Sequence, residues 1–263
     1  MTEEKQKWSD LLKVRRYDPS VKPPDINPIF TIQGKIVGML QSYIVFSGLP
    51  KASKSTFLAA VAASSITDSS IWQMRMSTPK ERRRIGYFDT EMSAFDFYRQ
   101  MDKIKYLAGS ELPPYFDAYS MREDMPSKIK MMVEQYLIDN PDCAVCFIDG
   151  FLDLCLNYND ERETRLLTNW FKRITKQYNC LLIGVIHLSK GVGETLGHLG
   201  SNTDRWAQST MIVEKVKETN QFVLKPKYLR SSDDFEPIAI MNYSGNWTQV
   251  PYIPVIPNVK AKK

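Results

Sequence analysis

The residues from Gly48 to Thr56 have the types and spacing of a loop that binds nucleotide phosphates. They read Gly-Leu-Pro-Lys-Ala-Ser-Lys-Ser-Thr, whereas the usual pattern has glycine, four residues, glycine, lysine and a hydroxyl residue. In such a loop, backbone N–H groups hold phosphate oxygens, Lys54 neutralises the β- and γ-phosphates, and the Ser55 hydroxyl is a ligand for Mg²⁺. We expect phosphate contacts from Gly48, Pro50, Lys51, Ala52, Ser53, Lys54, Ser55 and Thr56.

Ser53 is the departure from this pattern, because it stands where the second glycine belongs. Glycine there permits a positive φ and a close approach of the backbone to the phosphates, and a β-carbon opposes both. If Ser53 is forced to positive φ, the strain is on the order of 1 kcal/mol. We therefore expect weakened or retuned nucleotide binding. The alternative is a chance match, since glycine, proline, serine and lysine are common in turns.

Two carboxylates stand where strands are predicted to end. Asp149 directly follows the apolar run Val145–Ile148 and could hold Mg²⁺ opposite the Ser55 hydroxyl, or simply start a turn. Glu91 follows the run from Ile85 to Phe88 and could polarise the water that attacks a γ-phosphate, or favour the start of a helix through the helix dipole.

A histidine ends the next predicted strand. His187 follows the apolar run Leu181–Ile186 and precedes Lys190-Gly191. A polar side chain at that position could contact the γ-phosphate or the attacking water, although a lone histidine at a strand end is often only a surface residue.

The elements that must position these residues alternate between apolar strands and helices. Tyr43–Phe46 is predicted as a strand and Ser55–Ala63 as the helix that leaves the loop, with later helices at Ser93–Leu107, Ser127–Asp139 and Thr164–Tyr178. Ser93 is a predicted N-cap. The final strands are predicted at Thr210–Val216, Gln221–Leu224 and Ile238–Met241. The fold class is α/β: a mainly parallel twisted sheet flanked by helices, with antiparallel strands added near the C-terminus.

Length and composition favour one large domain. The chain has 263 residues, 43 % of them hydrophobic and 25 % charged, and lacks an apolar run long enough to span a bilayer. We expect residues 1–30 to form an arm that contacts a neighbouring subunit or the parent domain, 31–250 to form the main domain, and 251–263 to form an extended basic tail. The N-terminus does not resemble a signal peptide, so a cytoplasmic protein without membrane contact is expected.

The four cysteines are interpreted as buried free thiols. Cys143 and Cys146 form a Cys-x-x-Cys pair, but they lie in a predicted strand whose alternation should point them to opposite faces. The net charge of +5 permits a nucleic-acid partner without arguing strongly for one.

Taken together, the phosphate loop, the strand ending Asp89-Thr90-Glu91, the strand ending at Asp149, and the polar tip at His187 before a glycine-rich loop resemble the RecA-like ATPases. The resemblance covers roughly residues 34–245 and is closest to hexameric replicative helicases of the DnaB and plasmid RepA type. Phe88–Ser93 is similar to their segment with the catalytic glutamate, and Ile186–Lys190 is similar to their sensor strand.

The resemblance implies a RecA-like P-loop core with ATP and Mg²⁺ as ligands, in which Glu91, Lys54 and His187 are catalytic and Ser55 and Asp149 hold the metal. It also implies a ring, most simply a hexamer, in which a neighbour contributes basic fingers. Lys227 and Arg230 occupy the place of the family's Lys-x-Arg finger motif, with Arg230 one residue late, and Lys225 is a further candidate. In the family, loops corresponding to 157–163 and 189–204 bind single-stranded DNA. Here the first is acidic and the second nearly neutral.

Three functional hypotheses follow. The first is an ATP hydrolase acting as a helicase or helicase-like motor on single-stranded DNA, with replication or mobilisation proteins of a plasmid, phage or transposon as partners. The second is an ATP-binding regulatory or assembly protein that does not unwind DNA. The third is a P-loop kinase for a small molecule, with the basic run from Lys80 to Arg84 as its lid.

Overall fold

A central mixed sheet forms the core of the protein in a computed structural model that describes residues 3–22, 28–67, 69–188 and 197–254. Within these residues the strand order is β12-β11-β10-β9-β3-β8-β7-β5-β6. The six strands from β9 to β6 in this order are parallel: β9 (Ser209–Val216), β3 (Ser42–Gly48), β8 (Leu181–His187), β7 (Cys143–Asp149), β5 (Arg84–Asp89) and β6 (Phe116–Ser120). The antiparallel extension contains β10 (Gln221–Leu229), β11 (Ile238–Tyr243) and β12 (Asn246–Val250).

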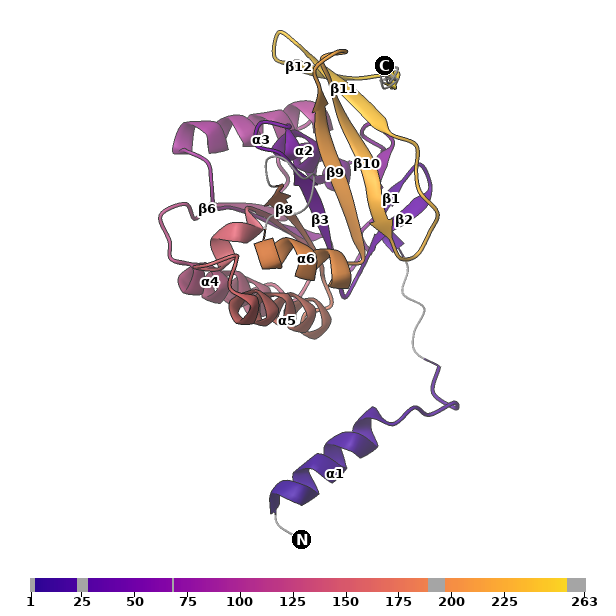
Figure 1. The fold of residues 1–263 in the computed structure, drawn as a ribbon, viewed down its shortest axis with the longest axis vertical. Coiled ribbons are helices and arrows are strands. Elements are labelled where there is room, and N and C mark those ends of the chain that lie inside the picture. Colours follow the sequence, from indigo (N-terminus) through magenta and orange to yellow (C-terminus); the bar gives the residue numbers. More distant parts are fainter. Residues whose placement is uncertain (1–2, 23–27, 68, 189–196, 255–263) are drawn as a thin grey trace, which may run out of the picture.

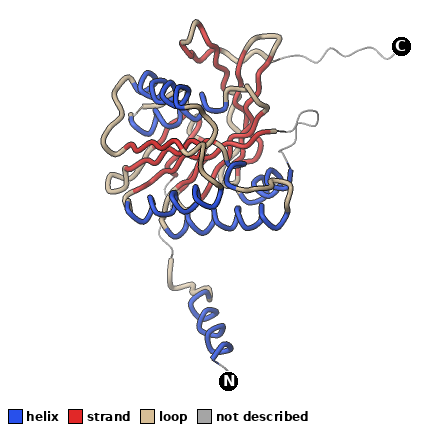
Figure 2. The backbone as a smooth tube through the Cα atoms, turned by 90° about the vertical axis from the view of Figure 1, so that its left-hand side faces the viewer, coloured by secondary structure: helices blue, strands red, loops and turns tan. Residues whose placement is uncertain are grey.

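Helices cover both faces of this sheet (Figures 1 and 2). One face carries α2 (Lys54–Ile66) and α3 (Ala94–Ala108), and the other carries α4 (Pro126–Asp139), α5 (Glu161–Gln177), α6 (Gly197–Trp206) and the short 3₁₀ helix η1 (Phe151–Leu154). A small second sheet of β2 (Lys35–Met39), β1 (Pro28–Ile32) and β4 (Met74–Met76) packs beside α2. The helix α1 (Glu3–Arg15) lies apart from the sheet (Figure 1).

Burial on both faces explains why the central strands are so apolar. Every residue of β7 is buried, and α2 is buried almost all round because it lies between the main sheet, α3 and β4. The surface helix α5 instead buries one stripe that includes Leu167, Phe171 and Ile174. Such a two-layered core fixes the strand ends that carry the polar residues.

The predicted fold class is confirmed, and so is the order of strand, loop and helix around residues 48–56. Ser93 is the N-cap of α3, and its hydroxyl accepts a hydrogen bond from the Asp96 N–H at 3.2 Å. The short strands β4 and β6 and the last strand β12 were not predicted. Residues Lys225–Leu229 extend β10 beyond its predicted end at Leu224.

The expectation that Cys143 and Cys146 point to opposite faces is wrong. Their sulfur atoms lie 3.6 Å apart, because the pairing of β7 with β5 slips between Cys143 and Val145 and thus shifts the alternation by one residue. All four cysteines are nevertheless buried and free, as predicted.

The loop predicted for residues 189–204 is corrected in its second half. Residues 197–206 form α6 despite Gly197 and Gly200, and this helix packs beside α5. Residues 189–196, with Lys190 and Gly191, lie outside the described part of the chain. The predicted acidic loop 157–163 is also shorter, because α5 begins at Glu161 with Asp160 as its N-cap.

None of the helices in the described residues is long and apolar enough to cross a bilayer.

Candidate functional site

The carboxyl ends of four parallel strands bring the predicted site residues together. In the sheet register Gly48 of β3 lies opposite His187 of β8, and Asp89 of β5 lies opposite Asp149 of β7. Glu91 follows β5 by two residues. Ligands bind at this edge in open α/β sheets, and the predicted residues all come from it except Lys227 and Arg230.

The phosphate loop makes a tight turn between β3 and α2. A β-carbon at Gly48 would collide with the carbonyl of Val213 on β9, so the loop can begin only with glycine at this position. Ser53 has φ 67° and ψ 33°, a left-handed conformation, and its side chain makes no capping hydrogen bond to α2. Lys51 also has a positive φ, 64°. The strain predicted for a positive φ at Ser53 is therefore present in the folded chain.

Lys54 is buried at the start of α2, with a side chain that returns toward the loop. Its ammonium donates to the carbonyls of Gly48 and Leu49, both at 3.0 Å, and lies 3.1 Å from Nδ1 of His187. Burial lowers the pKa of Lys54 to about 8, while Glu91 and Asp149 act in the opposite direction. A short movement of the Lys54 side chain would bring its ammonium from these carbonyls to a phosphate that enters the loop.

His187 links Lys54 to Glu91. Its Nε2 lies 3.1 Å from a carboxylate oxygen of Glu91, and its Nδ1 faces the Lys54 ammonium. An ammonium can only donate, so Nδ1 must accept, which leaves the ring proton on Nε2 to donate to Glu91. The histidine is thus more than a surface residue: it joins the predicted phosphate-binding lysine to the predicted water-activating acid.

Asp149 has the surroundings of a Mg²⁺ ligand. It is 1 % exposed, and burial raises its pKa to about 7, against hydrogen bonding from the Ser55 hydroxyl and Tyr87, which lowers it. The Tyr87 hydroxyl donates to its carboxylate at 3.3 Å. A hydroxyl and a carboxylate at one point are hard oxygen donors of the kind that Mg²⁺ takes alongside phosphate oxygens, so these residues fit the metal.

Other acids nearby were not among the predicted site residues. Asp89 is completely buried, accepts a hydrogen bond from the Met92 N–H at 2.8 Å, and has its pKa raised to about 6 by burial. Asp153 accepts from the Thr90 hydroxyl at 2.7 Å, and burial raises its pKa. Asp89 was visible beside Glu91 in the sequence, but only the strand register places it opposite Asp149.

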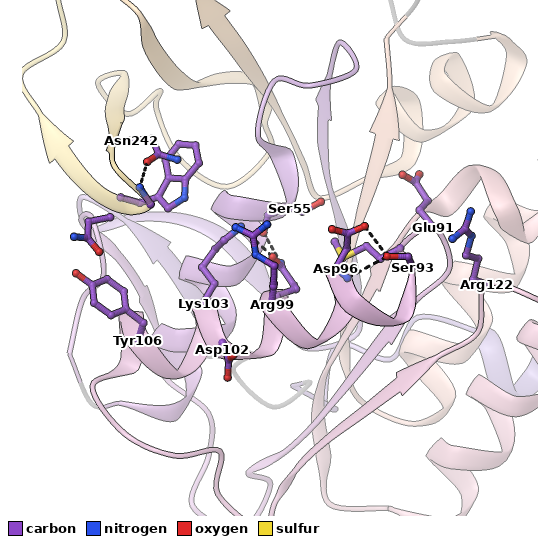
Figure 3. Close-up of a pocket in the computed structure, with 15 residues that line it drawn as sticks. Ser55, Glu91, Ser93, Asp96, Arg99, Asp102, Lys103, Tyr106, Arg122 and Asn242 are labelled. Carbon is purple, nitrogen blue, oxygen red and sulfur yellow. Dashed lines mark hydrogen bonds between the residues drawn. The ribbon is translucent and has the colours of Figure 1, made fainter.

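A cleft of about 700 Å³ opens beside the loop (Figure 3). It begins at Ser55 and Glu91, follows α3, and reaches the turn between β11 and β12 at Trp247. Figure 3 shows Glu91 near Arg122 at one end, and Lys103 and Arg99 between Ser55 and the β11–β12 turn. A long ligand anchored on the phosphate loop therefore has space to extend along α3.

Gln100 of α3 connects the phosphate loop to the strand that supports Asp149. Its amide nitrogen donates to the Ser55 carbonyl at 2.6 Å and to the Tyr87 hydroxyl at 3.1 Å. Its amide oxygen accepts from Lys103 at 3.2 Å. Sequence reasoning missed Gln100 and Lys103, since a polar residue on a helix has no signal until α3 is placed against α2.

The finger candidates are spread along β10. Lys225 pairs with Ile212, which is level with Ser47 beside the loop. Lys227 lies between the levels of Phe46 and Val45, and Arg230 lies beyond the end of β10. Leu229 pairs with Ser209, which is level with Ile44, four residues before Gly48 on β3. At about 3.3 Å per residue this places Arg230 more than about 13 Å along the strands from the loop. Neither Lys227 nor Arg230 lines the cleft.

Each finger candidate is held by its own chain. Lys227 forms an ion pair of 2.6 Å with Asp204 of α6, and Lys225 forms one of 2.6 Å with Glu214 of β9. Arg230 donates to the carbonyl of Ala207 at 2.7 Å and to that of Arg205. In this arrangement these cations fasten α6 and β9 to β10.

The basic run proposed as a kinase lid is locked in place. Arg82 donates to the carbonyls of Pro141, Cys143 and Tyr178, and Arg84 pairs with Asp117 at 2.9 Å. Arg84 begins β5, so the run lies at the amino ends of the strands, away from the phosphate loop. A basic run in that position cannot close over a nucleotide in the phosphate loop. The kinase hypothesis therefore has no lid segment.

The described parts of the predicted DNA-binding loops contain few free cations. In the first, both carboxylate oxygens of Glu163 accept backbone N–H groups, from Leu156 and Asn157. After the second, Trp206 is 51 % exposed at the end of α6, and the ammonium of Lys172 lies 4.3 Å from its ring centroid. These contacts alone do not define a nucleic-acid site.

Comparison with protein-family models matches residues 30–193 to the family described as "AAA domain". This segment includes the phosphate loop, Glu91, Asp149 and His187, and it ends before Lys227 and Arg230. A comparison with curated proteins returned no match.

Proposed function

The chain belongs to the AAA domain family of P-loop ATPases, and on that premise we propose that it hydrolyses ATP as a ring-forming motor on single-stranded DNA. The observation that carries the hydrolytic part is the chain of contacts from Lys54 through His187 to Glu91, next to Ser55 and Asp149. It combines a phosphate-binding cation, a metal site and a base within one edge of the sheet.

The proposed roles follow from the chemistry of each group. Lys54 and the backbone N–H groups of residues 48–56, apart from Pro50, hold the β- and γ-phosphates at the N-terminus of α2. Ser55 and Asp149 would hold Mg²⁺, which would supply charge neutralisation on the phosphates. Glu91 takes a proton from the attacking water as the bond between the γ-phosphorus and its bridging oxygen breaks. His187 leaves Lys54 when a phosphate engages that ammonium, and so signals that nucleotide is bound.

The ring rests on the position of the finger candidates. Arg230 lies far from the phosphate loop of its own chain, and neither Lys227 nor Arg230 lines the cleft beside that loop. We therefore infer that they complete the site of a neighbour, as in the DnaB and plasmid RepA helicases that the sequence resembles. A basic residue supplied in trans to a transferring phosphoryl group is worth about 10³–10⁵ in rate. Single-stranded DNA, a hexameric ring, a cytoplasmic location and a role in replication or mobilisation of a plasmid, phage or transposon are proposed from the same resemblance.

A second candidate is an ATP-dependent regulatory or assembly protein without unwinding activity. The observations that favour it are the strained Ser53 and the ion pair that holds Lys227 to Asp204. A protein of this kind would bind ATP and change its assembly, with turnover that is slow and indifferent to DNA.

Two measurements on the wild-type chain separate the candidates: ATP turnover with and without single-stranded DNA, and native mass with ATP and Mg²⁺. The motor hypothesis predicts an assembly with the mass of a ring, whose ATP turnover rises when single-stranded DNA is added. Tight ATP binding with no stimulation by DNA would support the regulatory protein. Absence of ATP binding would contradict both.

A further inference from the structure

We propose that Lys103 is a second phosphate-binding lysine, which holds the α-phosphate of the nucleotide while Lys54 holds the β- and γ-phosphates. This inference rests on the proposed ATP site and adds a residue from α3 to it. Lys103 lines the cleft that begins at Ser55. Its ammonium donates to the Thr56 hydroxyl at 3.2 Å, directly after the residue proposed as the metal ligand.

Lys103 forms no ion pair with the described residues. Its ammonium contacts a hydroxyl, the Gln100 amide oxygen at 3.2 Å and, at 5.9 Å from the ring centroid, the face of Trp247. Within the described part of the chain, no carboxylate lies in ion-pair distance of it. Burial, followed by Arg99, lowers the pKa of Lys103, while the more distant Asp149 acts in the opposite direction, so the folded chain tolerates this cation at a cost. A cation placed in this way gains most from an anionic ligand.

Lys105, two residues along the same helix, has a charge that protein carboxylates neutralise. Its ammonium pairs with Asp102 at 2.8 Å and with Glu111 at 3.5 Å, and it does not line the cleft. The two lysines have the same chemistry and backbone setting, and they differ in whether protein carboxylates neutralise the charge. Lys105 is therefore a matched control.

The direction of the nucleotide places the α-phosphate on the Lys103 side. The γ-phosphate must lie near Glu91 and His187, because the attacking water does. The rest of the molecule then runs past Ser55 and Thr56 into the cleft, and Figure 3 shows Lys103 on the opposite side of Ser55 from Glu91. The last phosphate in that direction, next to the ribose, is the α-phosphate.

The test compares binding of ADP and of a slowly hydrolysed ATP analogue, each with Mg²⁺, by wild type, Lys103→Met, Lys103→Arg and Lys105→Met. Both ligands carry the α-phosphate, so Lys103→Met should weaken both by the same factor, about 10- to 100-fold. Lys103→Arg should recover part of that loss because it keeps the charge, and Lys105→Met should bind as wild type does. Turnover by Lys103→Met should show a raised KM with kcat nearly unchanged, because the α-phosphate is bound equally before and during the reaction.

A folded Lys103→Met variant whose affinity for ADP stays within about twofold of wild type would overturn the inference. Loss of ATP-analogue binding with ADP binding retained would also overturn it, since the lysine would then serve the γ-phosphate. If Lys103→Met does not fold, Lys103→Gln, which can still hydrogen bond to Thr56, decides by the same criteria. Failure of the wild type to bind either nucleotide would instead overturn the proposed function, and this inference with it.

Discussion

The two ends of the sheet treat their charged residues in different ways. At the carboxyl end, Lys54, His187 and Glu91 contact one another beside an open cleft. Toward the amino end, Lys227 of β10 is 17 % exposed in its ion pair with Asp204, and at that end Arg230 is bound to carbonyl groups of its own chain. The charged groups at the carboxyl end face an open cleft, whereas the cations toward the amino end are bound to acids and carbonyl groups of their own chain.

This difference suggests how one chain could provide both halves of a composite site. The carboxyl end offers every group that phosphate binding and water activation require, apart from a cation for the transition state. The amino end holds such cations, but a neighbour's phosphate must displace Asp204 from Lys227 to use this one. We therefore expect the ATP sites to become competent only when subunits assemble, and the following predictions test one end against the other.

The largest effect should come from Lys54→Ala. Removal of the ammonium leaves the β- and γ-phosphates without their cation, so ATP turnover should fall to background and ATP affinity by at least about 100-fold. Turnover and nucleotide binding measured on the same preparation check this. Lys105→Ala, which removes a lysine outside the site, is the control. Near-normal binding by Lys54→Ala would mean that residues 48–56 are not the phosphate loop.

Glu91→Gln should separate binding from hydrolysis. The amide keeps the shape and can still meet the Nε2 of His187, but it cannot accept a proton, so kcat should drop about 10²- to 10⁴-fold with ATP affinity preserved. Single-turnover kinetics with labelled ATP measure this directly. If turnover survives the substitution, another group activates the water, and Asp153, which interacts with both Glu91 and His187, is an alternative acid at this edge.

The buried pair Asp89 and Asp149 makes stability depend on pH. Burial raises their pKa values to about 6 and about 7, above the usual value of 3.8, so the folded chain prefers their neutral forms. Their contribution to the free energy of unfolding is full below about pH 4 and is lost as pH rises through 6 to 7. Asp89→Asn keeps the shape without the charge, and it should exceed wild type in the free energy of unfolding by about 3 kcal/mol at pH 8, at 1.36 kcal/mol for each pKa unit.

Urea denaturation of wild type and Asp89→Asn at pH 4, 6 and 8 measures this difference, which should shrink toward zero at pH 4. A matched substitution, Asp102→Asn on the surface of α3, should show no such trend. Equal stabilities of wild type and Asp89→Asn at all three pH values would mean that Asp89 titrates normally.

The smallest effect should follow Ser53→Gly. Because Ser53 already has φ 67°, its strain is present before any nucleotide binds and should be relieved in the free and bound protein alike. We expect the free energy of unfolding to change by about 1 kcal/mol or less, since glycine also gains entropy in the unfolded chain. Nucleotide affinity should change little. A large gain in affinity would show that the serine β-carbon obstructs the phosphates.

Local patterns in the sequence were sufficient for the groups at the carboxyl end. Asp149 and His187 come directly after an apolar run, and residues 48–56 and Glu91 follow one within three residues. Apolar runs in an alternating α/β pattern become parallel strands whose ends coincide. The fold class followed for the same reason. The short edge strand β6 was missed because Phe116–Ser120 is only five residues long and its outer residues are polar.

Contacts between elements far apart in the chain could not be predicted from the sequence. Gln100, Lys103 and Asp89 gain their partners only when α3 meets α2 and β5 meets β7 in register. The slip in strand pairing that turns Cys143 and Cys146 to the same side is invisible in a regular alternation. The same holds for Lys227, because its partner Asp204 lies in a segment that was predicted as a loop.

The central claim, that each ATP site uses residues from two chains, is tested most directly by mixing two inactive variants. Lys54→Ala lacks its own phosphate cation but keeps its basic residues at the amino end, and Lys227→Ala or Arg230→Ala has the reverse defect. In a one-to-one co-assembled ring, roughly one interface in four joins an intact loop to an intact finger. ATP turnover should then recover to about a quarter of the wild-type value. A mixture no more active than the two variants measured separately would contradict the account.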